Sequence, residues 1–580
     1  MAIFLFLTGF STYLYTLYPS VSPFRDAGDL TASVFTLGIA HPPGYPVYVI
    51  LGKIWTVLIP FGNIGYRLNL FSAFTSSLTV MMVYFVMLEV RCKTKDEKPF
   101  FNIHLTSLVS LLPALFLAFS TAFWRQSILA EIYSMNALFA VLIIYLLLLP
   151  TFHFLLPAFL FGLGLGNHHT LVLLLPGIFY LLIKRLGKTF LPSALYLLSA
   201  FLLGFSVYIF LLVRAKQQPL NNWGNPQTIS NFVNVLTRSD YGTVKLSSRY
   251  SGTTSRNTLT DSAKMFWQLF KNQFGWLGIV LAAGGVFFCF YRKSPDGRRH
   301  LSPPYLIFFL FFLFTGPFFI FLSRLPNNEF SLAMLEPSCV LSSVFIALII
   351  GTGIGGLMDI LKGQLLFPRI FPPFFLILPI FLFEQNFRQL NKRNNFLCYD
   401  YGKNLLRSIP KNSYLLMTAD IPIFTVNYLQ NVEKMRPDVK VILSSFMTWR
   451  LAEYEQKYPE IFRGENSAST IETLLNKSDK FAVFTEGVHS GLENYVIPRG
   501  LACLVLKNAT AVQKAGKVSR GIFLFELYPF RKSKNQLDYY EKTVLSYYAD
   551  AAVNAGVILS QAGWQKEAET EFQRKLEYER

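Results

Sequence analysis

Charged residues are scarce in this chain of 580 residues. They make up 15% of the sequence, whereas 52% of the residues are hydrophobic and 58 are phenylalanine. A soluble globular protein carries about 25% charged residues, so the composition excludes that class and indicates many helices that face lipid. We therefore expect a polytopic α-helical membrane protein.

Cysteine is also rare, and its five positions form no motif. Cys92, Cys289, Cys339, Cys398 and Cys503 are isolated, without a C-x-x-C pair or a spacing typical of metal ligands. The sequence therefore predicts no resident cofactor and no metal site, and it leaves a metal requirement open.

Three other features are missing. The chain has no P-loop, so ATP-driven transport is not expected. Its net charge of +19 forms no basic stripe with interleaved aromatic residues, which favours loops beside anionic lipid over binding of nucleic acid. The first apolar segment, residues 2–18, lacks the basic leader and cleavage site of a secretory signal, so we expect a retained anchor.

Apolar segments of about 20 residues, oriented by the basic loops, predict about 11 spanning helices within residues 1–384. One group of basic residues is expected on the inner side: Arg91, Lys184 and Arg292. A second group of polar residues is expected on the outer side: Asp26, Glu131, His169 and Arg214. Val47 to Pro60 is too short to span, because about 14 residues rise only ~21 Å, so we expect it to lie along or dip into the outer leaflet.

The composition after residue 384 is that of a soluble domain. In residues 385–535, apolar runs at 413–417 and 439–443 flank a helical stretch at 425–434, with a turn at 419–422, which indicates an α/β unit. In residues 536–580, apolar residues at helical spacing are interrupted at Gly563 and Trp564. This pattern predicts a helical hairpin similar to one tetratricopeptide repeat.

Two carboxylates, Asp26 and Asp29, follow the first apolar segment. A base held at the membrane boundary can act on a substrate delivered from lipid, whereas a polar loop between helices would explain the same residues. His41 opens the run H-P-P-G-Y-P, which must bend the chain; His41 either binds substrate or only caps this bend.

Other polar residues on the same side are further candidates for substrate binding. Arg125 and Glu131 either contact substrate or form a structural ion pair. His168 and His169 follow a glycine-rich helix end, and because adjacent side chains point to different faces, at most one is expected to contact a phosphate. Arg214 is either a clamp for a lipid phosphate or an interfacial arginine. A polar loop that contains Thr237 to Tyr241 follows it.

Several motifs occur in one order within roughly the first 240 residues: R-D-A-G-D (25–29), G-I-A-H-P-P-G-Y-P (38–46), Y-R-L-N-L (66–70), W-R-Q-S-I-L-A-E-I-Y-S-M-N (124–136) and G-L-G-L-G-N-H-H-T (162–170). Together they resemble the transmembrane O-mannosyltransferase family of the transmembrane protein 260 type, within the GT-C glycosyltransferases. The resemblance implies a GT-C fold and a polyprenyl-phosphate-linked sugar donor. It also implies that Asp26 is the catalytic acidic residue, whereas Asp29 replaces the usual glutamate and has a shorter reach.

The sequence thus favours an inverting glycosyltransferase that moves a monosaccharide, mannose by the resemblance, to a protein or glycan acceptor at the outer or lumenal face. Inversion needs one base, Asp26, with Asp29 orienting Asp26 or the acceptor, and cations for the leaving phosphate. The alternative is a flippase or transporter of lipid-linked sugars. The membrane is expected to be the inner membrane of a bacterium or the endoplasmic reticulum of a eukaryote.

Overall fold

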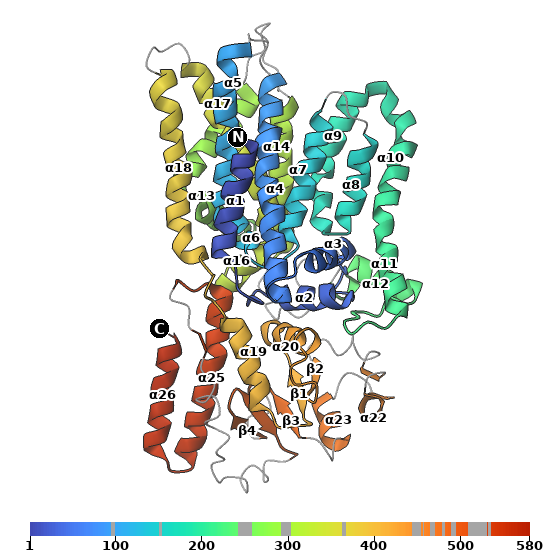
Figure 1. Cartoon of the computed structure of the whole chain (residues 1–580), viewed down its shortest axis with the longest axis vertical. Coiled ribbons are helices and arrows are strands. Elements are labelled where there is room, and N and C mark those ends of the chain that lie inside the picture. Colours follow the sequence, from blue (N-terminus) through green and yellow to red (C-terminus); the bar gives the residue numbers. More distant parts are fainter. Residues whose placement is uncertain are drawn as a thin grey trace.

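The computed structural model describes most of the chain: residues 1–93, 99–149, 154–241, 258–291, 303–361, 367–443, 454–455, 458–463, 470–477, 482–488, 495–507, 530–531 and 535–579. A bundle of long helices forms one end of the molecule, and an α/β domain with a helical hairpin forms the other (Figure 1). The sequence predicted this division of the chain into a membrane part and a following soluble part.

The bundle is built from apolar helices. Its first half contains α1 (Ala2–Thr16), α4 (Ile64–Lys93), α5 (Pro99–Phe119), α6 (Thr121–Ser127), α7 (Tyr133–Leu148) and α8 (Leu155–Leu165). Its second half contains α9 (Leu175–Leu186), α10 (Phe190–Phe205), α11 (Ile209–Lys216), α13 (Leu259–Tyr291), α14 (Pro303–Leu313), α15 (Phe319–Ser323), α17 (Cys339–Leu361) and α18 (Phe367–Leu390). Two short helices lie within the second half: α12 (Ile229–Thr237) between α11 and α13, and α16 (Glu329–Leu335) between α15 and α17.

Among the described residues, five helical segments are long and apolar enough to cross a membrane, or six if α5 and α6, bent by 68°, count as one span. Other apolar helices, α1, α7 and α8 among them, are shorter than 18 residues. The helical membrane class is therefore confirmed, and the count of 11 spans stays a prediction.

Two short helices lie across the end of the bundle that faces the soluble part: α2 (Ala27–Thr36) and α3 (Pro46–Leu58) (Figure 1). The 13 residues of α3 rise only ~20 Å, less than the ~30 Å of a hydrocarbon core. As predicted for Val47 to Pro60, this segment is too short to span.

The two ends of α7 locate the polar groups along the bundle. At its beginning, the ring of Tyr133 lies 5.3 Å from that of His168. At its other end, Arg185 donates to the carbonyl oxygens of Leu147 and Leu149, the latter at 2.8 Å. The histidine pair and the basic last turn of α9 thus lie at opposite ends of α7, as expected. Arg292 lies outside the described residues.

The soluble part contains one five-stranded sheet of order β2-β1-β3-β5-β4. Its strands are β1 (Tyr414–Met417), β2 (Lys440–Leu443), β3 (Val483–Thr485), β4 (Val496–Arg499) and β5 (Ala502–Val505). Strands β2, β1 and β3 are parallel, and β5 is antiparallel to both β3 and β4. The helices of this part are α19 (Leu397–Ser408), α20 (Asp420–Asn431), α22 (Pro459–Phe462) and α23 (Thr470–Lys477).

The turn expected at residues 419–422 is wrong, because α20 already begins at Asp420. Pro422 lies in its first turn, where a backbone N–H has no partner within the helix and its loss costs little. The proline is therefore compatible with the helix and does not precede it. The strands on either side lie within one residue of their predicted bounds.

The chain ends in a hairpin of α25 (Tyr539–Gln561) and α26 (Gln565–Glu579), with the break at the predicted place. Its likeness to a tetratricopeptide repeat stays a prediction. The boundary predicted after residue 384 falls inside α18, which continues to Leu390. A buried ion pair fixes the hairpin to the bundle, because Lys392 Nζ lies 2.7 Å from Glu541 Oε2, and Tyr18 donates to Glu541 Oε1.

Candidate functional site

Asp26 precedes α2 at the end of the bundle, where its carboxylate remains partly accessible. Its side chain is 17% exposed and makes no capping hydrogen bond to the helix. The Nη2 of Arg25 lies 3.5 Å from Asp26 Oδ2, and the Nε2 of His41 lies 3.8 Å from the same oxygen. Because neither contact encloses the carboxylate, Asp26 can still meet an incoming hydroxyl.

Asp29, one helical turn later, is fully buried and accepts four hydrogen bonds. Its Oδ2 accepts from the backbone N–H of His41 at 3.0 Å and from His41 Nδ1 at 2.8 Å. Its Oδ1 accepts from Asn221 Nδ2 at 2.8 Å and from Trp223 Nε1 at 3.0 Å. These contacts show that the carboxylate of Asp29 holds His41 in place. They do not support the expected role of Asp29 in orienting the acceptor or Asp26.

His41 is the link between the two aspartates. A carboxylate can only accept, so the bond to Asp29 requires a proton on Nδ1 and leaves Nε2 facing Asp26 and, at 3.1 Å, the hydroxyl of Tyr45. Burial lowers the pKa of His41, but the charges of Asp26 and Asp29 outweigh burial, and the pKa is raised above 6.5. For Asp29, burial raises the pKa, but the hydrogen bonds from His41 and Asn221 outweigh burial. The pKa of Asp29 is therefore lowered below 3.8.

Glu131 lies in the turn between α6 and α7 and is fully buried. Burial, followed by the negative charge of Asp26, holds its pKa well above the usual range. Its Oε1 has no hydrogen-bond partner among the described residues. Glu131 thus lies within electrostatic range of Asp26, and its raised pKa favours the protonated carboxylic acid.

The two adjacent histidines point to different surroundings, as the sequence predicted. The ring of His168 stacks on Tyr45, with centroids 6.1 Å apart and planes at 7°, and its Nδ1 lies 2.6 Å from Thr170 Oγ1. His169 instead bonds Tyr208 through Nε2 at 2.7 Å. His168 therefore shares the surroundings of Asp26 and His41, whereas His169 has a structural partner within the bundle.

Arg238, at the end of α12, is the functional candidate that sequence analysis missed. Its charge, after burial, helps to lower the pKa of His168 well below the usual range, and it also opposes protonation of His41. Its Nε is buried without a partner among the described residues, and its guanidinium lies 5.5 Å from the ring centre of Tyr241. A site for a phosphate needs such a cation. The polar loop that holds Arg238 was recognised, but its approach to the histidines depends on tertiary structure.

Two arginines predicted to bind substrate have other partners. Arg125 forms an ion pair with Glu336 and not with Glu131, so the ion pair considered from the sequence is wrong. Arg214 donates from Nε to the carbonyl oxygen of Leu37 at 2.6 Å and from Nη2 to that of Thr36 at 3.1 Å. It therefore holds the last turn of α2, and these contacts favour neither a phosphate clamp nor a free interfacial side chain.

The α/β domain covers this site through α20. A Cβ atom at Gly28 of α2 would lie 2.3 Å from the carbonyl oxygen of Phe424 in α20. The backbones of α2 and α20 are therefore in close contact at this glycine. The ring of Phe424 lies 6.4 Å from that of His41, with planes at 25°. Burial raises the pKa of Asp420 at the start of α20, while Arg25 and His41 oppose this. The soluble domain thus forms one wall of the site.

The cluster combines a partly exposed carboxylate, an imidazole held by a buried aspartate, a buried glutamate with a raised pKa and an arginine. Within the described part of the chain, no group of three or more His, Cys, Asp or Glu side chains could hold a metal ion. The arrangement offers a base for a hydroxyl proton and a positive charge for a leaving phosphate.

Two family models match the chain. The model described as protein O-mannosyl-transferase TMEM260 N-terminal domain covers residues 26–190, which begins at Asp26, and that of TMEM260-associated domain 2 covers residues 398–460. The chain is also 27% identical over 495 residues to protein O-mannosyl-transferase tmem260 of Dictyostelium discoideum. It is 27% identical over 488 residues to protein O-mannosyl-transferase TMEM260 of Mus musculus.

These alignments cover 77% and 79% of this chain, but only 57% and 65% of the two relatives, so the chain spans less than two thirds of their length. Among solved structures, ArnT from Cupriavidus metallidurans in the apo state matches with a TM-score of 0.55 and 11% identity, covering 88% of this chain and 98% of ArnT. The likeness to ArnT confirms the expected GT-C type of fold. The chain is therefore similar to the TMEM260 proteins over most of its own length, as its motifs indicated.

Proposed function

We propose that this chain is an inverting glycosyltransferase that moves a monosaccharide from a polyprenyl phosphate to a hydroxyl group of a protein or glycan. The relatives are named protein O-mannosyl-transferases, which makes mannose the sugar we propose. The observation that carries the proposal is the accessible carboxylate of Asp26, 3.8 Å from a histidine that buried Asp29 holds in place.

In the proposed reaction, Asp26 accepts the proton of the acceptor hydroxyl while that oxygen attacks the anomeric carbon of the sugar. The bond between the anomeric carbon and the phosphate oxygen breaks, and the polyprenyl phosphate leaves with the electron pair. Arg238 is the proposed cation for this phosphate, because its Nε lacks a partner among the described residues. Attack opposite to the leaving group inverts the anomeric configuration.

The other residues of the cluster prepare this step. Asp29 holds His41 in place with its Nε2 3.8 Å from Asp26 Oδ2, and the raised pKa of His41 favours a positive charge at this position. Glu131 is buried and its pKa is raised, and in its protonated form it can donate a hydrogen bond to a sugar or phosphate oxygen. Phe424 and Asp420 place the soluble domain where the acceptor would enter. We propose that this end of the bundle is the outer or lumenal face of the bacterial inner membrane or of the endoplasmic reticulum.

The test uses the purified full chain in detergent with a synthetic polyprenyl-phosphate mannose labelled in the sugar. A serine- or threonine-rich peptide and a free glycan are offered as acceptors, each with and without a chelator, since the metal requirement is open. We expect label on an acceptor hydroxyl with the anomeric configuration opposite to that of the donor. Retained configuration, or lipid movement without transfer in reconstituted vesicles, would contradict the proposal.

A further inference from the structure

A cavity of about 360 Å³ lies in the soluble part, at the edge of the sheet where the parallel strands end. Its floor is formed by the residues that follow β1 and β3, among them Thr418, Ala419 and Glu486. The segment that leads into β5, Gly500 to Cys503, closes one side. Nothing in the proposed transfer step uses this cavity.

The position of the cavity follows from the strand order. The connection from β1 leads to β2 on one side, and the chain then returns past β1 to place β3 on its other side. The strand order therefore reverses between β1 and β3. In open α/β sheets, ligands bind in the crevice outside the carboxyl ends of the strands at such a point. Here that crevice is the cavity.

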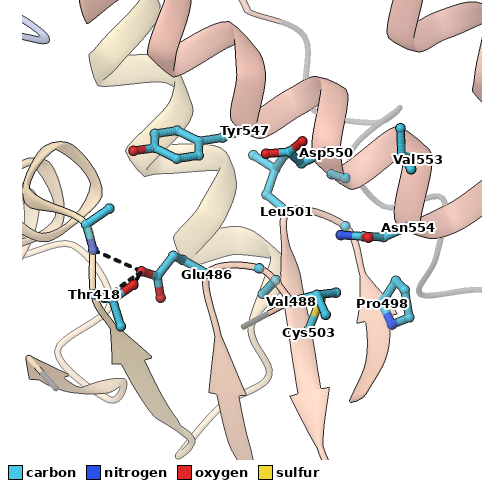
Figure 2. Close-up of a pocket in the computed structure, with 15 residues that line it drawn as sticks. Thr418, Glu486, Val488, Pro498, Leu501, Cys503, Tyr547, Asp550, Val553 and Asn554 are labelled. Carbon is cyan, nitrogen blue, oxygen red and sulfur yellow. Dashed lines mark hydrogen bonds between the residues drawn. The ribbon is translucent and has the colours of Figure 1, made fainter. Parts of the chain in front are cut away.

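Helix α25 supplies the opposite wall. Figure 2 shows the side chains of Tyr547, Asp550 and Asn554 on this helix, across the cavity from Thr418 and Glu486. The carboxylate of Glu486 is held in place, because its Oε1 accepts from the backbone N–H of Thr418, from the Thr418 hydroxyl at 2.7 Å and from the N–H of Ala419. The polar groups around the cavity are therefore carried by regular elements and by a fixed turn.

The chemistry of the lining defines the class of ligand. It includes two carboxylates, an amide, two hydroxyl groups and an aromatic ring, while no Lys, Arg or His is among the described lining residues. These described residues disfavour a phosphate or nucleotide, because a carboxylate repels an anion and none of them carries a compensating positive charge. Carboxylate and amide oxygens instead accept from neighbouring hydroxyl groups, and the ring of Tyr547 offers an apolar face.

We propose that this cavity binds a neutral saccharide of one or two rings, so that the soluble domain carries a sugar-binding site separate from the transfer site. The volume lies at the lower end of the range for small-ligand pockets, which suits a ligand of this size. The saccharide can be free or attached to an acceptor protein. The proposal goes beyond the transfer reaction and does not depend on it.

Binding is measured by saturation-transfer NMR on the full chain in detergent, with methyl α-mannoside, methyl β-galactoside and an O-mannosylated peptide beside its unmodified form. We expect signals from the ring protons of at least one glycoside or of the peptide-linked sugar. Asp550→Asn should weaken binding roughly 10-fold or more, because hydrogen bonds to a charged group are the strong ones, and Asn554→Leu should do the same or abolish it. Signals from the peptide-linked sugar alone would identify the attached form as the ligand.

Two controls locate the bound sugar. Ser546→Ala, at an exposed position of α25 outside the cavity lining, should leave the signals unchanged. Arg238→Ala should also leave them unchanged, since it alters the transfer site and not the cavity. Absence of signal for every saccharide, signals that persist in both cavity variants, or equal binding of the unmodified peptide would overturn the proposal. Melting curves of each variant show that the fold is retained.

Discussion

The Nδ1 atom of His41 lies 2.8 Å from Oδ2 of Asp29, whose side chain is fully buried, whereas the side chains of His41 and Asp26 are partly exposed. Asp29 lies in α2 and His41 follows the helix, 12 positions later in the chain. The aspartate fixes the tautomer and orientation of the imidazole, so the two acids of the R-D-A-G-D motif have different tasks. Asp26 faces the site, and Asp29 supports it from behind.

The first prediction concerns pH and stability. The pKa of His41 is raised in the folded chain, so its contribution to stability is complete below about pH 6.5 and is lost as the pH rises through the folded value. We expect the wild-type melting temperature in detergent to fall over this range above pH 6.5. His41→Gln, which does not titrate, should lack this part of the decline. An equal decline in both proteins would show that the pair does not stabilise the fold through charge.

The second prediction separates two arginines. Arg238→Ala should weaken donor binding roughly 10- to 100-fold, because it removes a charge-assisted hydrogen bond to phosphate, with little change in melting temperature. Arg214→Ala should do the reverse, since it removes bonds to the carbonyl oxygens of Thr36 and Leu37 and should cost about 1 kcal/mol or more of stability. Binding of labelled polyprenyl-phosphate mannose and thermal unfolding measure the two effects. Weak donor binding by Arg214→Ala with unchanged stability would instead indicate that Arg214 binds the phosphate.

The third prediction tests the cover formed by the soluble domain. Gly28→Ala should destabilise the contact between α2 and α20, because its new methyl group would lie 2.3 Å from the carbonyl oxygen of Phe424. In an isolated helix the same change stabilises by about 1 kcal/mol, so the direction is diagnostic. Gly284→Ala in α13 is the matched control, since a Cβ there meets nothing within 4 Å. Transfer rate and protease sensitivity should change only in Gly28→Ala.

The fourth prediction concerns the junction of bundle and hairpin. Glu541→Gln removes the carboxylate 2.7 Å from the buried ammonium of Lys392 and leaves Asp538, at 3.8 Å, as its charged partner. Weakening a buried pair in this way costs about 3 kcal/mol. We expect a lower melting temperature and faster proteolysis between α18 and α25. Glu569→Gln, at an exposed position of α26, should stay within about 0.5 kcal/mol of wild type. Equal melting temperatures for the two variants would exclude a stabilising role of the pair.

Local sequence predicted much of this architecture. The apolar segments, the short α3 after the H-P-P-G-Y-P bend and the break at Gly563 all follow from rules that act over a few residues. The α/β unit was also recognisable, but its helix runs from Asp420 to Asn431 and not over residues 425–434. Its start was misplaced because a proline within a first turn resembles a turn signal. These features depend on neighbours along the chain.

The pairing of charged groups could not be predicted in the same way. Arg125 pairs with Glu336, which is 211 positions away, and Arg214 with carbonyl oxygens of α2. Together with burial, Arg238 at the end of α12 lowers the pKa of His168 from a segment with no motif of its own. Such contacts depend on how the helices pack. The sequence therefore allowed us to group the polar residues expected on one side of the membrane, but it did not predict which residues they contact.

The fifth prediction is the most direct, and it concerns Asp26. Asp26→Asn keeps the size of a partly exposed side chain, so the variant should fold and bind labelled polyprenyl-phosphate mannose as the wild type does. Its single-turnover transfer rate should fall by roughly 10²- to 10⁴-fold, because an amide cannot accept the acceptor proton. Asp29→Asn should instead lower both the rate and the melting temperature, since it disturbs the buried bond to His41.

The measurement that tests the central claim is therefore the transfer rate of Asp26→Asn with donor saturating and donor binding recorded on the same sample. Our account predicts normal donor binding with a rate reduced at least about 100-fold. A transfer rate near that of the wild type, with donor equally bound, would contradict it and remove Asp26 as the base.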